Sequence, residues 1–343
     1  MKEALLEHLA CPDCPGLGVE LKLEGERLAQ GEIESGALRC PSCGLAWPIE
    51  AGVPNFVARG DRADVVQTTS GFARNWDAFN DVILDNEELN DELFRDWIAP
   101  FDPEQFRGKV VLEPGCGMGR WLRVAAKYGP RTLIGVDYSE VAYTAARNVR
   151  ALPDVHVVRA DIRRLPLKKR IEHEYCLGVV HHTPDPAGTF DALVRALAPG
   201  GQINCWVYGA EGNGWITKFV DPVRLRLTSK LPHKLLAVFS KALALPLYGA
   251  AALASKLPAM PYGEYLRYLR RYPFHYMSHI VYDHLVPEIA HYIGRAELES
   301  WAARHGMSFS ISARNGNSWR LLATRSVAVA VPSEKPRPSA TGT

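Results

Sequence analysis

A glycine-rich loop limits the possible folds of this chain more than any other feature. Glycines alternate with other residues between Glu113 and Gly119, directly after the apolar run Lys109–Glu113 and before a helical pattern. Because glycine has no Cβ, such a loop can turn sharply between a strand and a helix while a ligand approaches its backbone. The free N–H groups and the positive dipole at the helix start suit a carboxylate. The loop therefore predicts a ligand site beyond the C-terminal end of a strand.

The loop lies in a region where strand and helix patterns alternate. Short apolar runs predict strands over Lys109–Glu113, Thr132–Asp137, Val155–Arg159, Tyr175–Val180 and Gln202–Tyr208. The segments between them predict helices over Gly119–Lys127, Ser139–Val149 and Ala187–Leu197. Two later runs, Met307–Ile311 and Ser318–Val327, could form a closing antiparallel pair. Alternation with short loops gives right-handed crossovers and a parallel sheet. We predict an α/β fold, a Rossmann-like seven-stranded sheet with helices on both faces.

Composition and pattern divide the whole chain into six segments. We expect a small β-rich domain at 1–57, a linker with two helices at 58–107, the core at 108–208, a helical insertion or lid at 209–292, a C-terminal helix with closing strands at 293–330, and a disordered tail at 331–343. In the first domain, strands are expected over Val19–Leu23, Leu38–Cys43 and Trp47–Val57. The two helices after the linker are expected over Gly71–Asn80 and Glu87–Ala99.

Acidic residues follow the next two strands of the core. Asp137 ends the run Leu133–Asp137, about 20 residues after the loop, which is the interval expected of an acid that binds ribose hydroxyls. Asp161 follows the third strand. A glycine-rich turn alone is weak evidence, and these acids strengthen the prediction of a nucleoside-containing ligand.

These segments resemble the class I methyltransferases that use S-adenosylmethionine (SAM), and more narrowly the group typified by enzymes of ubiquinone and menaquinone biosynthesis. Residues 111–120 resemble their first motif. Four later segments match further motifs in order: Gly135–Ser139, Ala160–Ile162, Gly178–His182 and Leu197–Gly201. The resemblance covers roughly 108–208. A dinucleotide-binding sheet is the alternative, but its loop has the spacing Gly-x-Gly-x-x-Gly, whereas this loop has Glu-x-Gly-x-Gly-x-Gly.

The resemblance implies a set of cofactor-binding residues. The glycines would contact the methionine part of SAM, Glu113 would hold the loop and the amino group, and Asp137 would bind both ribose hydroxyls. Asp161 would accept a hydrogen bond from the adenine amino group. The full set is Glu113, Gly115, Cys116, Gly117, Gly119, Asp137, Tyr138, Ser139, Asp161, Ile162, Gly178 and Val179, with Phe72 and Trp76.

Phe72 and Trp76 belong to a segment that resembles one which folds over SAM in related enzymes. The alternative is that both residues, with Phe79, form the buried face of an amphipathic helix. The fourth strand departs from the family pattern, which has an aspartate and an apolar run there. Glu172 would replace the aspartate. His173 and Glu174 are unusual in a buried central strand, so we expect a frayed strand start or a modified site.

His181 and His182 follow the fourth strand, near the place where the methyl group would be transferred. Either is a candidate catalytic general base for a hydroxyl or phenol. The alternative is that the pair shapes the turn and caps the next helix. The insertion is rich in tyrosine and histidine, which suggests an aromatic or lipophilic acceptor, although aromatic residues at helical spacing also form cores.

The cysteines Cys11, Cys14, Cys40 and Cys43 form two C-x-x-C pairs. Four thiolates on tight turns suit tetrahedral Zn²⁺ in a closed, structural site, and a reduced cluster without metal is the alternative. The segment 1–57 also resembles the small zinc-ribbon proteins that activate tRNA and protein methyltransferases, and fused versions precede rRNA methyltransferase domains. That resemblance raises RNA as a substrate. No dense basic face is evident in this segment, so a structural or docking role is favoured.

Charge and hydropathy set the remaining expectations. The net charge of +2 argues for neither nucleic acid nor an anionic membrane as a partner. The runs Arg163–Arg164 and Lys168–Arg170, with Arg224, Arg226, Lys230 and Lys234, are basic patches that are solvated faces or anion sites. The apolar stretch Ala242–Ser255 contains Pro246 and Gly249 and falls short of the ~20 residues that span a bilayer. We expect no secretory signal, no membrane span and a cytoplasmic protein.

Together these features predict a SAM-dependent methyltransferase that transfers a methyl group by direct displacement to a small-molecule acceptor, which is aromatic or lipophilic. An RNA methyltransferase that uses the zinc ribbon to bind its substrate is the second hypothesis. A non-catalytic SAM-binding scaffold is the third. The sequence identifies neither the acceptor nor the oligomeric state.

Overall fold

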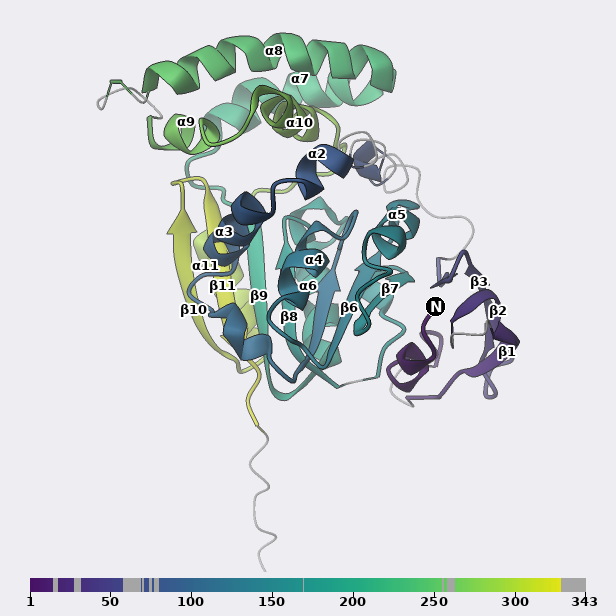
Figure 1. The fold of residues 1–343 in the computed structure, drawn as a ribbon. Helices are drawn as coiled ribbons and strands as arrows, with labels where there is room; N and C mark the ends of the chain where they lie inside the picture. The colour runs from purple at the N-terminus through teal and green to yellow at the C-terminus, as the bar shows by residue number, and fades with distance from the viewer. Residues whose placement is uncertain are drawn as a thin grey trace, which may run out of the picture.

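A computed structural model of the chain describes residues 1–14, 18–27, 32–57, 69, 71–73, 76, 80–168, 170–254, 256–257 and 263–327. Its described part contains a central sheet of seven strands in the order β10-β11-β9-β8-β5-β6-β7 (Figure 1). The strands are β5 (Val110–Pro114), β6 (Thr132–Asp137), β7 (Val155–Arg159), β8 (Ile171–Leu177), β9 (Leu197–Tyr208), β10 (Ser308–Arg314) and β11 (Ser318–Thr324). Strands β5 to β9 pair in parallel, whereas β11 pairs antiparallel with β9 and β10. The predicted α/β sheet with a closing antiparallel pair is confirmed.

Helices cover both faces of this sheet. They include α3 (Glu87–Ile98), α4 (Arg120–Ala126), α5 (Val141–Asn148), α6 (Pro186–Ala196) and α11 (Arg295–Arg304). Neighbouring strand residues point to opposite faces, so Val111 enters the apolar core beneath α3, α4 and α5, while Leu112 enters the core beneath α6 and α11. The short helix α2 (Asn80–Leu84) precedes α3, and the 3-10 turns η2 (Pro103–Phe106), η3 (Ile162–Arg164) and η4 (Val180–His182) connect the elements.

The N-terminal 57 residues form a small domain of their own. Within its described residues, η1 (Glu3–Glu7) precedes a sheet ordered β1 (Lys22–Arg27), β2 (Ile33–Arg39), β3 (Ala46–Glu50) and β4 (Val53–Pro54). The strand expected over Leu38–Cys43 was wrong, because β2 ends at Arg39. Cys40 begins a tight turn, in which the Gly44 amide donates to the Cys40 carbonyl at 3.0 Å. The strand expected over Val19–Leu23 begins later, at Lys22.

This small domain packs against the β7 edge of the central sheet (Figure 1). The Phe56 amide donates to the Arg159 carbonyl at 2.7 Å, and Leu9 pairs with Leu167 in an isolated bridge. Basic residues of the core pair with acids of the small domain in three ion pairs: Arg164 with Asp13, Lys168 with Glu20 at 2.6 Å, and Arg150 with Glu32 at 2.9 Å. Arg164 and Lys168 therefore help to join the two domains, while Arg164 also stays exposed to solvent.

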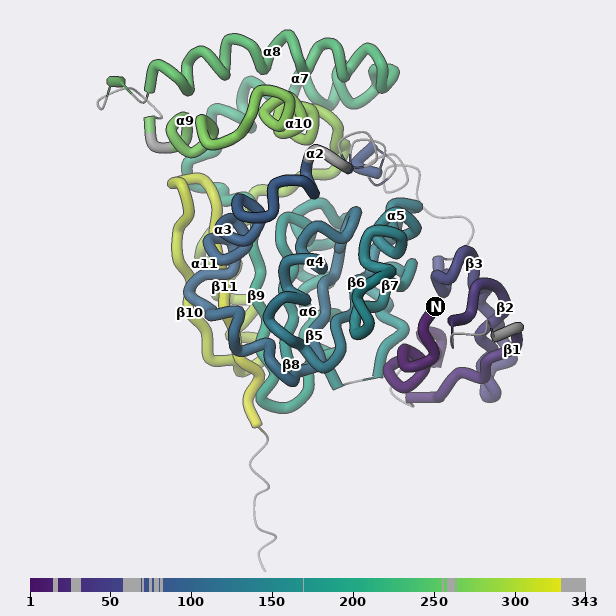
Figure 2. Tube along the Cα trace, in the orientation of Figure 1, coloured from purple at the N-terminus to yellow at the C-terminus, as the bar shows by residue number. Residues whose placement is uncertain are grey.

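The insertion forms a helical layer above the sheet (Figure 2). It contains a π-helical turn, η5 (Ile216–Val220), and η6 (Thr228–Lys230), with α7 (Asp221–Arg226), α8 (His233–Ala254), α9 (Gly263–Leu269) and α10 (Phe274–Leu285). The stretch Ala242–Ser255 was expected to be interrupted at Pro246 and Gly249, but α8 continues through both and has 22 residues. Among the described residues it is the single helix long and apolar enough to cross a membrane. Of the most apolar stretch of this helix, 22% is buried in the structure.

Some expectations lie outside the described residues. They concern most of the linker at 58–70, the side chain of Phe79 and the tail at 331–343.

Candidate functional site

The glycine-rich loop lies at the C-terminal end of β5, as predicted. Gly115, Gly117 and Gly119 have φ values of 76°, 52° and 82°, in the left-handed region that favours glycine. A Cβ on Gly115 would lie 2.4 Å from a methyl group of Val179, so a side chain there would collide with the turn after β8. Gly119 is the N-cap of α4, which leaves the first N–H groups of that helix directed toward the loop.

Asp137, at the end of β6, holds this loop in place through hydrogen bonds. One carboxylate oxygen accepts from the Gly117 amide at 2.9 Å, and the other accepts from the Ser139 amide at 2.9 Å and its hydroxyl at 2.7 Å. Burial raises the pKa of Asp137, although the bonds from Ser139 and Gly117 and the charge of Arg159 oppose that change. A carboxylate offers about four lone pairs, and these three bonds leave about one of them for a ligand hydroxyl.

Glu113 is a second acid beside the loop, and it is buried, with 2% of its surface exposed. The Tyr175 hydroxyl donates to it at 3.1 Å. Burial raises the pKa of Glu113 well above its usual range, and the neighbouring charge of Asp137 adds to the effect. Two neighbouring acids, one buried and one half-buried, favour a cationic ligand, because a positive charge between them would offset the cost of their desolvation.

The other predicted cofactor residues gather around these acids or just beyond them. Asp161 caps η3 and pairs with Arg163 at 2.6 Å, so a ligand amino group would share that carboxylate with the guanidinium. Ile162 is buried, and the Tyr138 carbonyl accepts from Arg159 at 3.2 Å. Cys116 is buried and packs toward β6, where a Cβ on Gly135 would lie 2.9 Å from its sulfur, so its role is packing.

The fourth strand is not frayed, although its register with β9 shifts between Ile171 and His173. Strand β8 includes His173 and Glu174, and both side chains are fully buried. The His173 ring is held by Asn204 at 2.8 Å and by the rings of Phe101 and Phe106. The expectation of a frayed start was wrong because these partners lie on other elements.

Glu172 does not lie at the site. It accepts from the Val110 amide at 2.8 Å and from Arg131 at 3.0 Å, where β8 and β5 begin. The loop and Gly178 lie at the opposite end of these parallel strands. Glu172 lies in the fourth strand, where the resemblance places an aspartate, and it joins the starts of the two strands.

Gly178, at the end of β8, opens onto an aromatic cluster. Its φ is 80°, and a Cβ there would lie 3.5 Å from Trp206 and 3.8 Å from Trp97. The rings of Trp97 and Trp206 have centroids 4.4 Å apart, and His181 lies 4.1 Å from Tyr208. We define the aromatic cluster as Trp97, His181, His182, Trp206 and Tyr208.

The two histidines have different environments in this cluster. The Nδ1 atom of His182 lies 2.7 Å from the Ile289 carbonyl, which can only accept, so Nδ1 carries the hydrogen and Nε2 keeps its lone pair. Both ring nitrogens of His181 are buried and have no hydrogen-bond partner within the described residues. Burial lowers the pKa of His181 well below its usual range and that of His182 to about 4. Neither histidine caps α6, since Asp185 does so by accepting from the Gly188 amide at 2.9 Å.

The aromatic residues upstream of the core lie over the site. The Trp76 indole is 3.8 Å from the position of a Cβ on Gly117 and 4.8 Å from the ring of His279 on α10. Phe72 meets His182 edge-on at 5.1 Å. Both side chains are half-buried and join the loop to the helical insertion, which agrees with the prediction that this segment folds over the loop.

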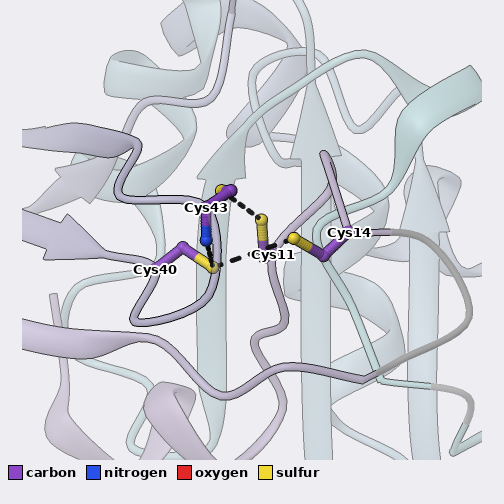
Figure 3. Close-up of side chains that lie close together, drawn as sticks. All are labelled: Cys11, Cys14, Cys40 and Cys43. Atoms are coloured by element: carbon purple, nitrogen blue, oxygen red, sulfur yellow. Dashed lines mark hydrogen bonds between the residues drawn. The ribbon is translucent and has the colours of Figure 1, made fainter.

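The four predicted cysteines of the N-terminal domain converge (Figure 3). Their sulfurs lie within 4.8 Å of one another, with Cys11 and Cys43 at 3.7 Å and Cys14 and Cys40 at 4.0 Å. Tetrahedral zinc bonds of about 2.3 Å place sulfurs about 3.8 Å apart, so the cluster has the size of a four-thiolate metal site. These side chains could hold a metal ion.

Two segments of the chain match known protein families. Residues 112–205 match the family model described as a methyltransferase domain, and residues 2–52 match the model of the Trm112p-like proteins. The chain joins a Trm112-like domain to a methyltransferase domain.

Curated relatives of the methyltransferase domain differ in their acceptors. A tRNA U34 carboxymethyltransferase of Sulfurovum sp. (strain NBC37-1) is 27% identical over 143 residues, which are 39% of this chain and 45% of that protein. A ubiquinone biosynthesis O-methyltransferase of Pseudomonas putida (strain GB-1) is 29% identical over 147 residues, 42% of this chain and 61% of that protein. The chain thus spans less than two thirds of either relative.

One solved structure also resembles this chain. It is a complex between the Trm112 methyltransferase activator of Haloferax volcanii and a methyltransferase, with 14% identity and a TM-score of 0.45. The match covers 75% of this chain and 98% of that one.

Sequence reasoning missed Arg120 in the methyltransferase domain. This first residue of α4 is 93% buried, its Nε donates to Asn90 at 2.8 Å, and one terminal nitrogen has no partner within the described residues. Its guanidinium stacks on Trp121 at 3.9 Å. A buried arginine directly after the last glycine of the loop is a charge suited to a ligand carboxylate. The available signal was a charged residue at the start of an otherwise apolar helix.

Buried histidines should make the chain sensitive to acid. Burial lowers the pKa of His156 to about 4 and those of His173 and His279 to about 3. Unfolded histidine titrates near 6.5, so below that pH the unfolded state binds protons that the folded state does not. Stability is therefore complete above about pH 6.5 and falls toward pH 4, by up to ~1.4 kcal/mol per pH unit for each histidine.

Urea unfolding at several pH values between 7.5 and 4.5 measures this effect. The acids Glu113 and Glu174 have raised pKa values and act in the opposite direction, but the lowered histidines outnumber them. A urea midpoint that stays constant or rises on acidification would contradict the expected loss of stability from the buried histidines.

Proposed function

We propose that this chain is a SAM-dependent methyltransferase. The observation that supports this most is the loop that Asp137 holds in place, which combines three left-handed glycines with the acids Glu113 and Asp137 in a domain similar to methyltransferases. The residues present fit SAM: the three glycines carry no side chain that would cover the loop backbone, Asp137 keeps an acceptor position for a ribose hydroxyl, and Arg120 has a buried donor that no described residue occupies. When bound, SAM supplies a methyl group on a cationic sulfonium.

For the acceptor we propose a small aromatic or lipophilic molecule. The aromatic cluster lies beside Gly178. The centroid of its Tyr208 ring is 6.0 Å from that of Tyr292 and 5.9 Å from that of His284, and both of these stacked rings belong to the insertion. Such a wall suits a flat apolar ring, which gains from both burial and ring stacking. The similarity to a ubiquinone biosynthesis O-methyltransferase supports the same class.

A second candidate is transfer to tRNA. The similarity to a tRNA U34 carboxymethyltransferase and the Trm112-like domain favour it. The basic residues Arg164 and Lys168, however, are paired with acids of the Trm112-like domain, which makes them less available to a phosphate backbone. The small-molecule acceptor is therefore the stronger proposal.

One experiment tests the function and separates these candidates. The purified chain is incubated with SAM carrying a labelled methyl group and with lysate divided into solvent extract, RNA and protein. We expect label in the solvent extract. Label in RNA alone would replace the first acceptor with the second. SAM binding without label in any fraction would overturn the enzymatic proposal and support a scaffold.

We propose His182 as the general base for a hydroxyl acceptor. The Ile289 carbonyl fixes its ring so that Nε2 can take a proton, which is the arrangement of an oriented base. Its pKa of about 4 keeps it neutral at physiological pH. His181 would instead form part of the acceptor wall.

His182→Gln should lower kcat by about 10²- to 10⁴-fold with little change in SAM affinity, as removal of a general base does. The measurement is steady-state kinetics with the labelled acceptor. His305→Gln is the control, since that histidine pairs with Asp191 on the opposite side of the sheet. Equal kcat values for the His182 variant and the control would rule out His182 as the base.

For the cysteine cluster we propose a structural Zn²⁺. The four thiolates leave no open coordination position, and the cluster lies in the N-terminal domain rather than at the loop. The ion would hold the turns at Cys11–Cys14 and Cys40–Cys43 together and so stabilise the domain that packs against β7.

A further inference from the structure

The outer surface of the helical insertion is unusually apolar. Of the fifteen large apolar side chains that are exposed in the described part of the chain, twelve lie between residues 215 and 257. They are Trp215, Phe219, Val223, Leu225, Leu227, Leu235, Val238, Phe239, Leu243, Leu245, Leu253 and Leu257. We call this set the apolar surface. It is far larger than the scattered exposed residues that a folded protein normally shows.

Helix α8 supplies the centre of this surface. Its inner residues Leu236, Ser240, Ala244, Ala251 and Ala254 are buried in the helical layer formed with α9 and α10. At about 100° per residue, Leu235, Val238 and Leu245 fall on the opposite side of the helix. Figure 1 shows α8 at the outer edge of the molecule, and these three side chains are more than half exposed. Both sides of α8 are therefore apolar, and no described residue covers the outer side.

The charges around the apolar surface indicate the kind of partner that it fits. Residues 212–263 contain seven lysines and arginines and a single acid, Asp221, although the remainder of the chain is net acidic. Asp221 pairs with Arg224 at 3.1 Å, so the exposed charges of this segment are cationic. Lys234 and Lys241 lie on α8 at the border of its apolar side, where a long side chain can reach a charged plane beside buried residues.

We infer that the apolar surface docks onto an anionic phospholipid bilayer, with α8 lying in the plane of the interface. An apolar helix side bordered by lysines is the pattern of interfacial helices, whose binding combines apolar burial with attraction to anionic headgroups. Spanning is excluded in this fold because the inner side of α8 packs on α9 and α10. RNA would not explain the leucines and valines, and a second copy would not explain the excess of cations. This inference does not depend on the chemistry of the acceptor.

Co-sedimentation of the full chain with vesicles tests the inference. We expect binding to vesicles of phosphatidylcholine with phosphatidylglycerol, weaker binding to phosphatidylcholine alone, and loss of the difference at high salt. Val238→Glu with Leu245→Glu should lower the partition coefficient at least ~10-fold. These side chains are 66% and 65% exposed, so the fold should tolerate the change, which circular dichroism checks.

Two further variants make the test specific. Val327→Glu is the matched control, because Val327 is 65% exposed outside the apolar surface and should bind vesicles as the unaltered chain does. Lys234→Gln with Lys241→Gln should weaken binding to anionic vesicles by roughly fivefold for each lysine and leave binding to neutral vesicles unchanged. The fluorescence of Trp215 should be quenched by brominated lipid, and Trp215→Phe should remove that quenching.

Three outcomes would overturn the inference. The first is no sedimentation with either kind of vesicle. The second is tRNA binding that the lysine variant abolishes while vesicle binding is absent. The third is a dimer in solution that the Val238 and Leu245 variant dissociates while vesicle binding is absent. Methyl transfer is measured separately, so failure here leaves the proposed function intact.

Discussion

Asp137→Ala should reduce SAM affinity at least about 100-fold in a protein that remains folded. The carboxylate is proposed to accept from a ribose hydroxyl with its remaining lone pair, and a hydrogen bond to a charged group contributes roughly 1.5–3 kcal/mol. The same carboxylate already accepts from the Gly117 amide and from Ser139, so its removal also releases the loop. Isothermal titration with SAM measures the change.

Two comparisons make this result interpretable. Asp154→Ala removes an exposed carboxylate just before β7 and should leave SAM affinity unchanged. Asp137→Asn keeps the size of the side chain and one acceptor oxygen, so its affinity should lie between those of the alanine variant and the unaltered chain. If the alanine variant binds SAM as tightly as the Asp154 variant does, the loop is not the cofactor site.

Cys40→Ser should release the metal and unfold the N-terminal domain while the central sheet stays folded. In zinc-binding peptides, structural zinc contributes roughly 10–16 kcal/mol of apparent binding energy, which exceeds the stability of a small domain. The domain has fewer than 60 residues, and its few buried apolar side chains share one core with the central sheet, so the turns that carry the cysteines depend on the metal. Metal analysis and calorimetry on the same samples measure metal content and the number of unfolding transitions.

Ser42→Ala is the matched control for the cysteine variant. Ser42 lies between Cys40 and Cys43 in the same turn and is exposed, so it should retain both metal and stability. The unaltered chain should contain about one equivalent of zinc when purified without chelator. A chain with only trace metal, or a Cys40 variant that unfolds as the control does, would refute the structural zinc.

The sequence predicted the parts of the fold that depend on local pattern. Alternating strands and helices around Gly115 and Gly119 indicate a parallel sheet, and its strand bounds differ by only a few residues from the predicted ones. The convergence of Cys11, Cys14, Cys40 and Cys43 also follows from spacing, because each C-x-x-C pair is local.

Features that depend on distant contacts could not be predicted in this way. His173 is polar, so pattern alone places it at a frayed end, yet Asn204 and two phenylalanine rings make its burial favourable. Pro246 costs about 3 kcal/mol in a helix interior, but α8 continues through it because packing on α9 and α10 outweighs that cost. Arg120 was missed because its partner Asn90 is 30 residues away.

The pairing of Phe56 with Arg159 has a consequence for solubility. Without the N-terminal domain, β7 would be an open edge of the central sheet, and open edges recruit strands from other chains. The Phe56 amide occupies one edge carbonyl, and the bridge between Leu9 and Leu167 covers apolar surface nearby. By covering this edge, the small domain thus also reduces the tendency of the chain to aggregate. Metal loss should first appear as concentration-dependent precipitation, before the sheet itself melts.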